Sequence, residues 1–148
     1  MSGTQRGVPA QGKGQEDLLV LLEEAQSKSG YLSEDIITEL AQSVAMSVSD
    51  VYGVATFYSF LSTKPLGRNV IRICQSLPCH LKDSQIVIES LADELDIKPG
   101  QTTPDGKFSF ELTNCIGVCD EAPAMLINND VHGNLTPKKI SEILKSYK

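Results

Sequence analysis

The four cysteines of this 148-residue chain occur as two close pairs. Cys74 and Cys79 are separated by four residues in "CQSLPC", and Cys115 and Cys119 are separated by three in "CIGVC". A thiolate is a nucleophile and also a ligand for soft metals. Four thiolates from two short loops can hold one zinc ion, or they can hold the two irons of a [2Fe-2S] cluster with one pair on each iron.

Spacing alone leaves several uses of these thiols open. Structural zinc sites and redox dithiols both favour C-x2-C pairs, and neither pair has that spacing. Cysteines that serve only as small apolar side chains fit poorly in loops that also contain Pro, Gly, Asn and Asp. His80 follows Cys79 directly, but four thiolates already complete the ligand set, so we expect an exposed loop histidine. Spacing therefore favours the cluster only modestly, and zinc is the main alternative.

The charge pattern excludes a nucleic-acid partner. The net charge of −6 is spread evenly, because residues 1–68 carry five basic and eight acidic side chains and residues 69–148 carry eight and eleven. No basic cluster is available to neutralise phosphates. The longest apolar run, "LLVLL" at 18–22, is much shorter than the roughly 20 residues of a membrane span. We expect a cytoplasmic protein without membrane insertion, whose thiols stay reduced and act as ligands.

The first part of the chain has a helical pattern. Residues 1–15 are rich in Gly and Gln, and we expect a disordered lead-in there. Residues 16–63 predict a helical segment of three helices. The first ends near Gly30, the second is capped by Ser33, and the third runs from about Ser49 to Leu61.

The hydrophobic period changes from helical to alternating at residues 62–68, which marks a candidate domain boundary. Residues 69–148 then predict the order β-α-β-β-α, with a helix at 83–97, a short return strand around Val131 and a last helix after Thr136, and therefore an α/β sandwich. "NVIRIC" is a buried strand that ends at Cys74, and a strand of alternating Phe108, Phe110 and Leu112 precedes Cys115. Because both cysteine pairs directly follow strands, we expect them to converge at one edge of the sheet.

Four motifs together carry a family resemblance. They are "GVATFY" at 53–58, "CQSLPC" at 74–79, "TPDGKFSFE" at 103–111 and "CIGVCDEAP" at 115–123. In this order the chain resembles the thioredoxin-like [2Fe-2S] ferredoxin family over about residues 16–148. That family includes the 24-kDa (E) subunit of NADH:quinone oxidoreductase and the small subunit of NAD(P)-linked [FeFe] hydrogenases.

The resemblance implies a thioredoxin-like domain that is preceded in the chain by an N-terminal helical bundle segment. It also implies a [2Fe-2S] cluster held by Cys74, Cys79, Cys115 and Cys119, and a cis bond before Pro123. Asn114 replaces a commonly acidic residue, which bears on the cluster potential and not on ligation.

The implied function is single-electron transfer within a complex. The implied partner is a larger flavoprotein subunit that binds FMN and NAD(H), with a further iron–sulfur or hydrogenase subunit beside it. No Gly-rich phosphate loop follows a strand in this chain, so we expect the nucleotide and flavin sites on that partner. The alternative is a zinc-stabilised interaction module. The parent complex could be a respiratory NADH dehydrogenase, a hydrogenase or a formate dehydrogenase.

Overall fold

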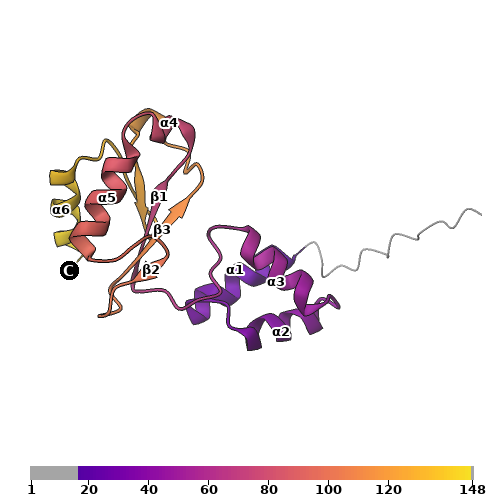
Figure 1. Ribbon diagram of the computed structural model, residues 1–148. Coiled ribbons are helices and arrows are strands. Elements are labelled where there is room, and N and C mark those ends of the chain that lie inside the picture. Colours follow the sequence, from indigo (N-terminus) through magenta and orange to yellow (C-terminus); the bar gives the residue numbers. More distant parts are fainter. Residues whose placement is uncertain (1–16, 148) are drawn as a thin grey trace, which may run out of the picture. The chain divides into compact units, whose positions relative to one another are not determined.

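The computed structural model describes residues 17–147 and contains two compact units (Figure 1). One unit ends at Lys64 and the other begins at Pro65. This division falls inside the 62–68 stretch, where the hydrophobic period changes. The expected lead-in at residues 1–15 lies outside the described residues.

The helical unit contains α1 (Leu18–Ser29), α2 (Glu34–Ser43) and α3 (Val48–Phe57). Gly30 ends α1 with φ +85°, and its N–H donates to the carbonyl of Gln26. The hydroxyl of Ser33 accepts a hydrogen bond from the N–H of Ile36 at the start of α2. These caps confirm the two helix ends that the sequence predicts, because each satisfies backbone groups that the helix leaves open.

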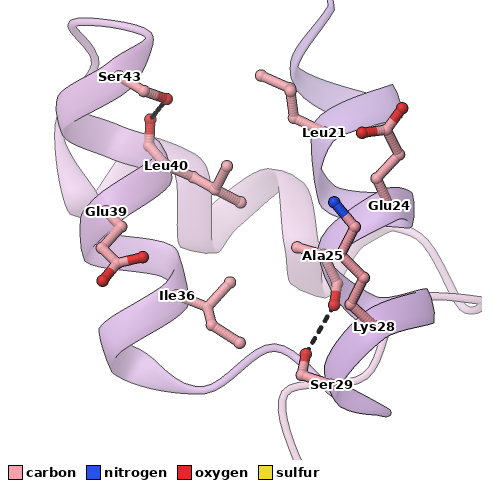
Figure 2. Close-up of a pocket in the computed structure, with 9 residues that line it drawn as sticks. All are labelled: Leu21, Glu24, Ala25, Lys28, Ser29, Ile36, Glu39, Leu40 and Ser43. Carbon is pink, nitrogen blue, oxygen red and sulfur yellow. Dashed lines mark hydrogen bonds between the residues drawn. The ribbon is translucent and has the colours of Figure 1, made fainter.

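The core of this unit lies between its three helices. It is formed by Leu18, Leu22, Leu32, Ile37, Ala41, Val44, Val51, Ala55 and Leu61. Beside this core, a groove of about 430 Å³ runs between α1 and α2 (Figure 2). Its floor is formed by Leu21 and Ala25 of α1 and by Ile36 and Leu40 of α2, and charged side chains stand at its rim.

The third helix is shorter than the sequence predicts. It ends at Phe57, and Tyr58 is already extended with φ −87° and ψ 119°. The segment that follows is held by α1, because the side-chain amide of Gln26 donates to the carbonyl of Phe60 and accepts from the N–H of Ser62. These long-range hydrogen bonds replace the next turn of helix, and no local pattern in the sequence indicates them.

The second unit is a mixed five-stranded sheet with helices. Its strand order is β2-β3-β1-β4-β5, in which β1 and β3 are parallel and the other neighbours are antiparallel. The strands are β1 (Asn69–Cys74), β2 (Gln101–Thr102), β3 (Phe108–Thr113), β4 (Met125–Ile127) and β5 (Asp130–His132), and the helices are α4 (Leu77–His80), α5 (Ser84–Leu95) and α6 (Pro137–Ser146).

Helices α5 and α6 cover one face of this sheet and contact each other (Figure 1). Strand residues that point to this face, such as Ile71, Ile73 and Phe110, are fully buried. They pack against Val87 and Leu91 of α5 and against α6. This arrangement confirms the α/β class. Because helices cover one face of the sheet, alternate strand residues such as Ile71 and Ile73 point to the core.

Three short elements were not predicted from the sequence. They are α4, the two-residue strand β2 and a 3-10 turn at Cys119–Glu121. The predicted 83–97 helix is also shorter, because Asp96 adopts a left-handed conformation with φ 53° and ends α5. Elements of two to four residues are too short to give a period in the sequence. Within residues 17–147, no helix is long and apolar enough to span a membrane.

Candidate metal centre

The two cysteine loops leave the sheet at the same level. Cys74, the last residue of β1, is the register partner of Thr113, the last residue of β3. Cys115 follows Thr113 by two residues. Because β1 and β3 are parallel neighbours, both loops start at the same edge of the sheet, and the expected convergence follows from this register.

The first pair is buried at this edge. Cys74 and Cys79 are 1% and 2% exposed and pack with Ala122 and the partly buried Ile116. Ser76 precedes α4, and the single turn of that helix brings Cys79 back toward the end of β1. Contact with Ile116 and Ala122 means that this pair packs against the loop of the second pair.

The second pair is exposed. The Sγ atoms of Cys115 and Cys119 are 3.6 Å apart, and the N–H of Gly117 donates to the Sγ of Cys115 at 3.4 Å. Gly117 adopts φ +84°, a conformation that glycine takes without steric cost. The 3-10 turn then places Cys119 beside Cys115.

The thiols influence one another's acidity. Burial raises the pKa of Cys79 to about 11, and the neighbouring Cys74 and Cys119 add to this increase. The hydrogen bond with Cys115 raises the pKa of Cys119. Burial also opposes ionisation of Cys74, but hydrogen bonds from Ser76, Cys79 and the backbone of Ile116 outweigh it, so the net pKa is lowered. The charge of a thiolate in one pair therefore raises the pKa of a thiol in the other pair.

A third segment completes the site. The peptide bond between Ala122 and Pro123 is cis, as the family resemblance implies. The next residue, Ala124, is fully buried, and its carbonyl accepts a hydrogen bond from the N–H of Cys74 at 3.4 Å. This hydrogen bond joins the residue before β4 to Cys74, the last residue of β1 and the first cysteine of the buried pair.

The donor set fits a group with two metal centres. All four cysteines are free thiols, and they are arranged as two pairs. A [2Fe-2S] cluster needs two thiolates for each of two irons, which is what two adjacent pairs offer.

Neither histidine joins the four thiols. His80 is exposed, as the sequence predicts, but it is the last residue of the short helix α4 and does not lie in a loop. The Nε2 atom of His132 lies 3.2 Å from the hydroxyl of Tyr147, which in turn donates to the carboxylate of Asp130. This second group pins the β4–β5 hairpin to the end of α6 and has a structural role.

The sequence is similar to the E subunits of NADH-quinone oxidoreductases. It is 45% identical over 123 residues to the E subunit of the NADH-quinone oxidoreductase of Escherichia coli strain K12, and the match covers 83% of this chain and 74% of the relative. The corresponding subunit of Pseudomonas aeruginosa is 37% identical over 122 residues, with 82% and 74% covered.

A solved structure shows the same architecture in another assembly. The crystal structure of an NAD+-reducing [NiFe]-hydrogenase in its air-oxidised state matches with a TM-score of 0.75 and 26% identity. The match covers 92% of this chain but only 24% of the hydrogenase chain, so this protein corresponds to about a quarter of that longer polypeptide.

The family model of the thioredoxin-like [2Fe-2S] ferredoxins matches residues 6–148, which is nearly the whole chain and includes all four cysteines. The resemblance inferred from the four motifs is therefore confirmed. The chain belongs to the thioredoxin-like [2Fe-2S] ferredoxin family, and its cofactor is a [2Fe-2S] cluster.

Proposed function

We propose that this protein is a one-electron carrier in which Cys74 and Cys79 hold one iron of the cluster and Cys115 and Cys119 hold the other. One observation carries the proposal. Two pairs of free thiols lie in loops that leave the sheet together, because Cys74 and Thr113, the last residues of β1 and β3, are register partners. When bound, a [2Fe-2S] cluster supplies reversible uptake of a single electron. The protein must hold it, shield it from water and present one side of it to a partner.

The two pairs divide these tasks. The buried Cys74 and Cys79 keep their side of the site away from water, and their backbone is tied to the sheet. Cys115 and Cys119 are exposed and form the side from which an electron can be exchanged. Leu77 of α4 and Leu81, directly after that helix, belong to the segment of the first cysteine pair and are 68% and 74% exposed, so a partner that covers the site would also bury apolar surface.

We propose that the partner is a larger flavoprotein subunit that binds FMN and NAD(H). Support comes from the relatives, which are subunits of NADH-quinone oxidoreductase, and from the structural neighbour, an NAD+-reducing hydrogenase. The protein would then act as an electron-transfer subunit of an NADH-linked complex in the cytoplasm. The flavin and the nucleotide chemistry would belong to the partner.

The helical unit offers a surface for this partner. Its aromatic surface consists of Tyr52, Phe57, Tyr58 and Phe60, whose side chains are 42–80% exposed. Gly53 lies in the same exposed part of α3, and a Cβ atom there would meet nothing within 4 Å. Glycine inside a helix costs about 0.5–1 kcal/mol relative to alanine. No contact among residues 17–147 requires glycine at this position, whereas close approach of another polypeptide would.

The competing function is a zinc-stabilised interaction module with the same four thiolates. Anaerobic purification of the full chain, followed by metal and sulfide analysis and a visible spectrum, separates the two. We expect a brown protein with about two iron and two acid-labile sulfide per chain, from the four-thiolate ligand count. A folded, colourless protein with stoichiometric zinc would refute the carrier function, because Zn²⁺ is d10 and has no visible absorption.

A further inference from the structure

A charged pair lies in the sheet next to the metal centre. Arg72 is in the central strand β1, two residues before Cys74, and only 8% of its side chain is exposed. Side chains alternate along a strand, so Arg72 points to the same face of the sheet as Cys74, opposite the core-facing Ile71 and Ile73. Two residues along a strand correspond to roughly 6.6 Å, which places the cationic side chain beside the ligand.

A charged partner of Arg72 comes from β3, the strand that precedes the second cysteine pair. Glu111 of β3 is its register partner, and the Nε atom of Arg72 lies 3.8 Å from the Oε2 atom of Glu111. The next pair on this face is Cys74 with Thr113, and Cys115 follows two residues later. The two charged residues therefore lie two positions before the ends of β1 and β3, where the cysteine loops begin.

Burial of this pair works against folding. Burial lowers the pKa of Arg72, and the opposing attraction of Glu111 is the smaller effect. Burial likewise raises the pKa of Glu111, and Arg72 offsets it only in part. A buried ion pair is often no more stabilising than apolar residues of similar size.

From this placement we infer that Arg72 sets the reduction potential of the cluster and that Glu111 moderates its effect. Uptake of one electron would add one negative charge to the cluster that the four thiolates would hold. A fixed cation held nearby, away from water, stabilises that added charge, and a carboxylate at the same place opposes it. Arg72 remains protonated throughout because guanidinium does not deprotonate in proteins. This role rests on the proposed cluster ligation by the four cysteines.

The test is a dye-mediated redox titration of the cluster-loaded, full-length protein, followed by visible absorption and by EPR. Arg72→Gln is expected to lower the potential and Glu111→Gln to raise it. A tenfold change in the ratio of reduced to oxidised protein at a fixed potential is the expected size, which is 59 mV for a one-electron couple. The variant Arg72→Lys, which keeps the charge, is expected to stay near the wild-type value.

A matched control is available at the other end of the same sheet. Lys107 precedes β3 and lies 3.8 Å from Asp105, but both side chains are more than half exposed. Lys107→Gln removes the same unit of charge from a solvated pair far from Cys74 and Cys115 along the strands, so the potential should stay unchanged.

Opposite signs separate an electrostatic effect from damage to the fold. The inference is overturned if Arg72→Gln and Glu111→Gln shift the potential in the same direction, or if Arg72→Gln behaves as Lys107→Gln does. Should Arg72→Gln fail to fold, Glu111→Gln and the double variant decide. The double variant should have a lower potential than Glu111→Gln, and equal potentials would overturn the inference. A wild-type protein that assembles no cluster would refute the proposed function instead.

Discussion

Cys74 and Thr113 face each other as the last residues of two parallel strands, and this pairing brings the two cysteine loops together. Parallel strands must be joined by a crossover, here the segment that contains α4 and α5. The two cysteine pairs are thus 36 positions apart between Cys79 and Cys115 in the chain, but the first pair packs against Ile116 and Ala122 of the second loop. The register, more than either loop alone, determines the geometry of the metal centre.

Replacement of any one of Cys74, Cys79, Cys115 or Cys119 by alanine should abolish or strongly destabilise the cluster, because two irons need four protein thiolates. His80→Ala should retain it, because this exposed side chain lies outside the thiol group. EPR spectra of the dithionite-reduced variants, with iron and sulfide analysis, measure the outcome. Loss of the signal in His80→Ala would reassign the ligands.

Gly133→Ala should loosen the second cysteine loop. A Cβ atom at Gly133 would overlap the Glu121 side chain and lie 3.0 Å from the Glu121 carbonyl, at the end of the turn that carries Cys119. Overpacking of this kind costs about 1–3 kcal/mol. We expect iron to be lost to a chelator several times faster than from the wild type, measured by bleaching of the visible absorption. Gly53→Ala, which meets no atom within 4 Å, is the control and should leave the rate unchanged.

Gly53→Ala should also separate stability from association. In the isolated protein it should raise the free energy of unfolding by about 0.5–1 kcal/mol, because alanine loses less backbone entropy in a helix. If a partner approaches α3 closely, the same methyl group should weaken binding of a co-expressed flavoprotein subunit. Urea denaturation and quantitative co-purification measure the two effects.

Two further variants make this experiment specific. Phe57→Ser removes the most exposed aromatic side chain of the aromatic surface and should reduce co-purification more than Gly53→Ala does. Gln42→Ala changes an exposed residue of α2 outside that surface and should have no effect. Full retention of the partner by both Phe57→Ser and Gly53→Ala would exclude α3 as the docking face.

Glu111 should make stability depend on pH. Burial raises its pKa above the ordinary value of 4.5, so between that value and the folded-state pKa the native protein binds more protons than the unfolded chain. Stability linked to this group is therefore present at low pH and declines as the pH rises through the folded-state pKa. Glu111→Gln should remove this pH dependence of the free energy of unfolding. The stability of the variant minus that of the wild type should therefore be larger at pH 7 than at pH 5. Denaturation curves at the two values measure it, and a pH-independent difference would contradict the assignment.

Much of this protein could be read from its sequence because the relevant signals are local. Gly30 and Ser33 mark helix ends, since the groups they satisfy lie within four residues of them. The apolar run in "NVIRIC" and the alternation in "FSFEL" identify β1 and β3, and the paired cysteines, with the motifs around them, identify the family.

Only the tertiary structure decided features that depend on partners distant in the chain. The third helix stops at Phe57 because Gln26 binds the segment after it, and Gly133 is required by Glu121, which lies 12 residues earlier. The pairing of Arg72 with Glu111 likewise arises from the register of β1 against β3. Sequence specifies which groups can interact locally, whereas long-range pairing depends on how the sheet and its core pack together.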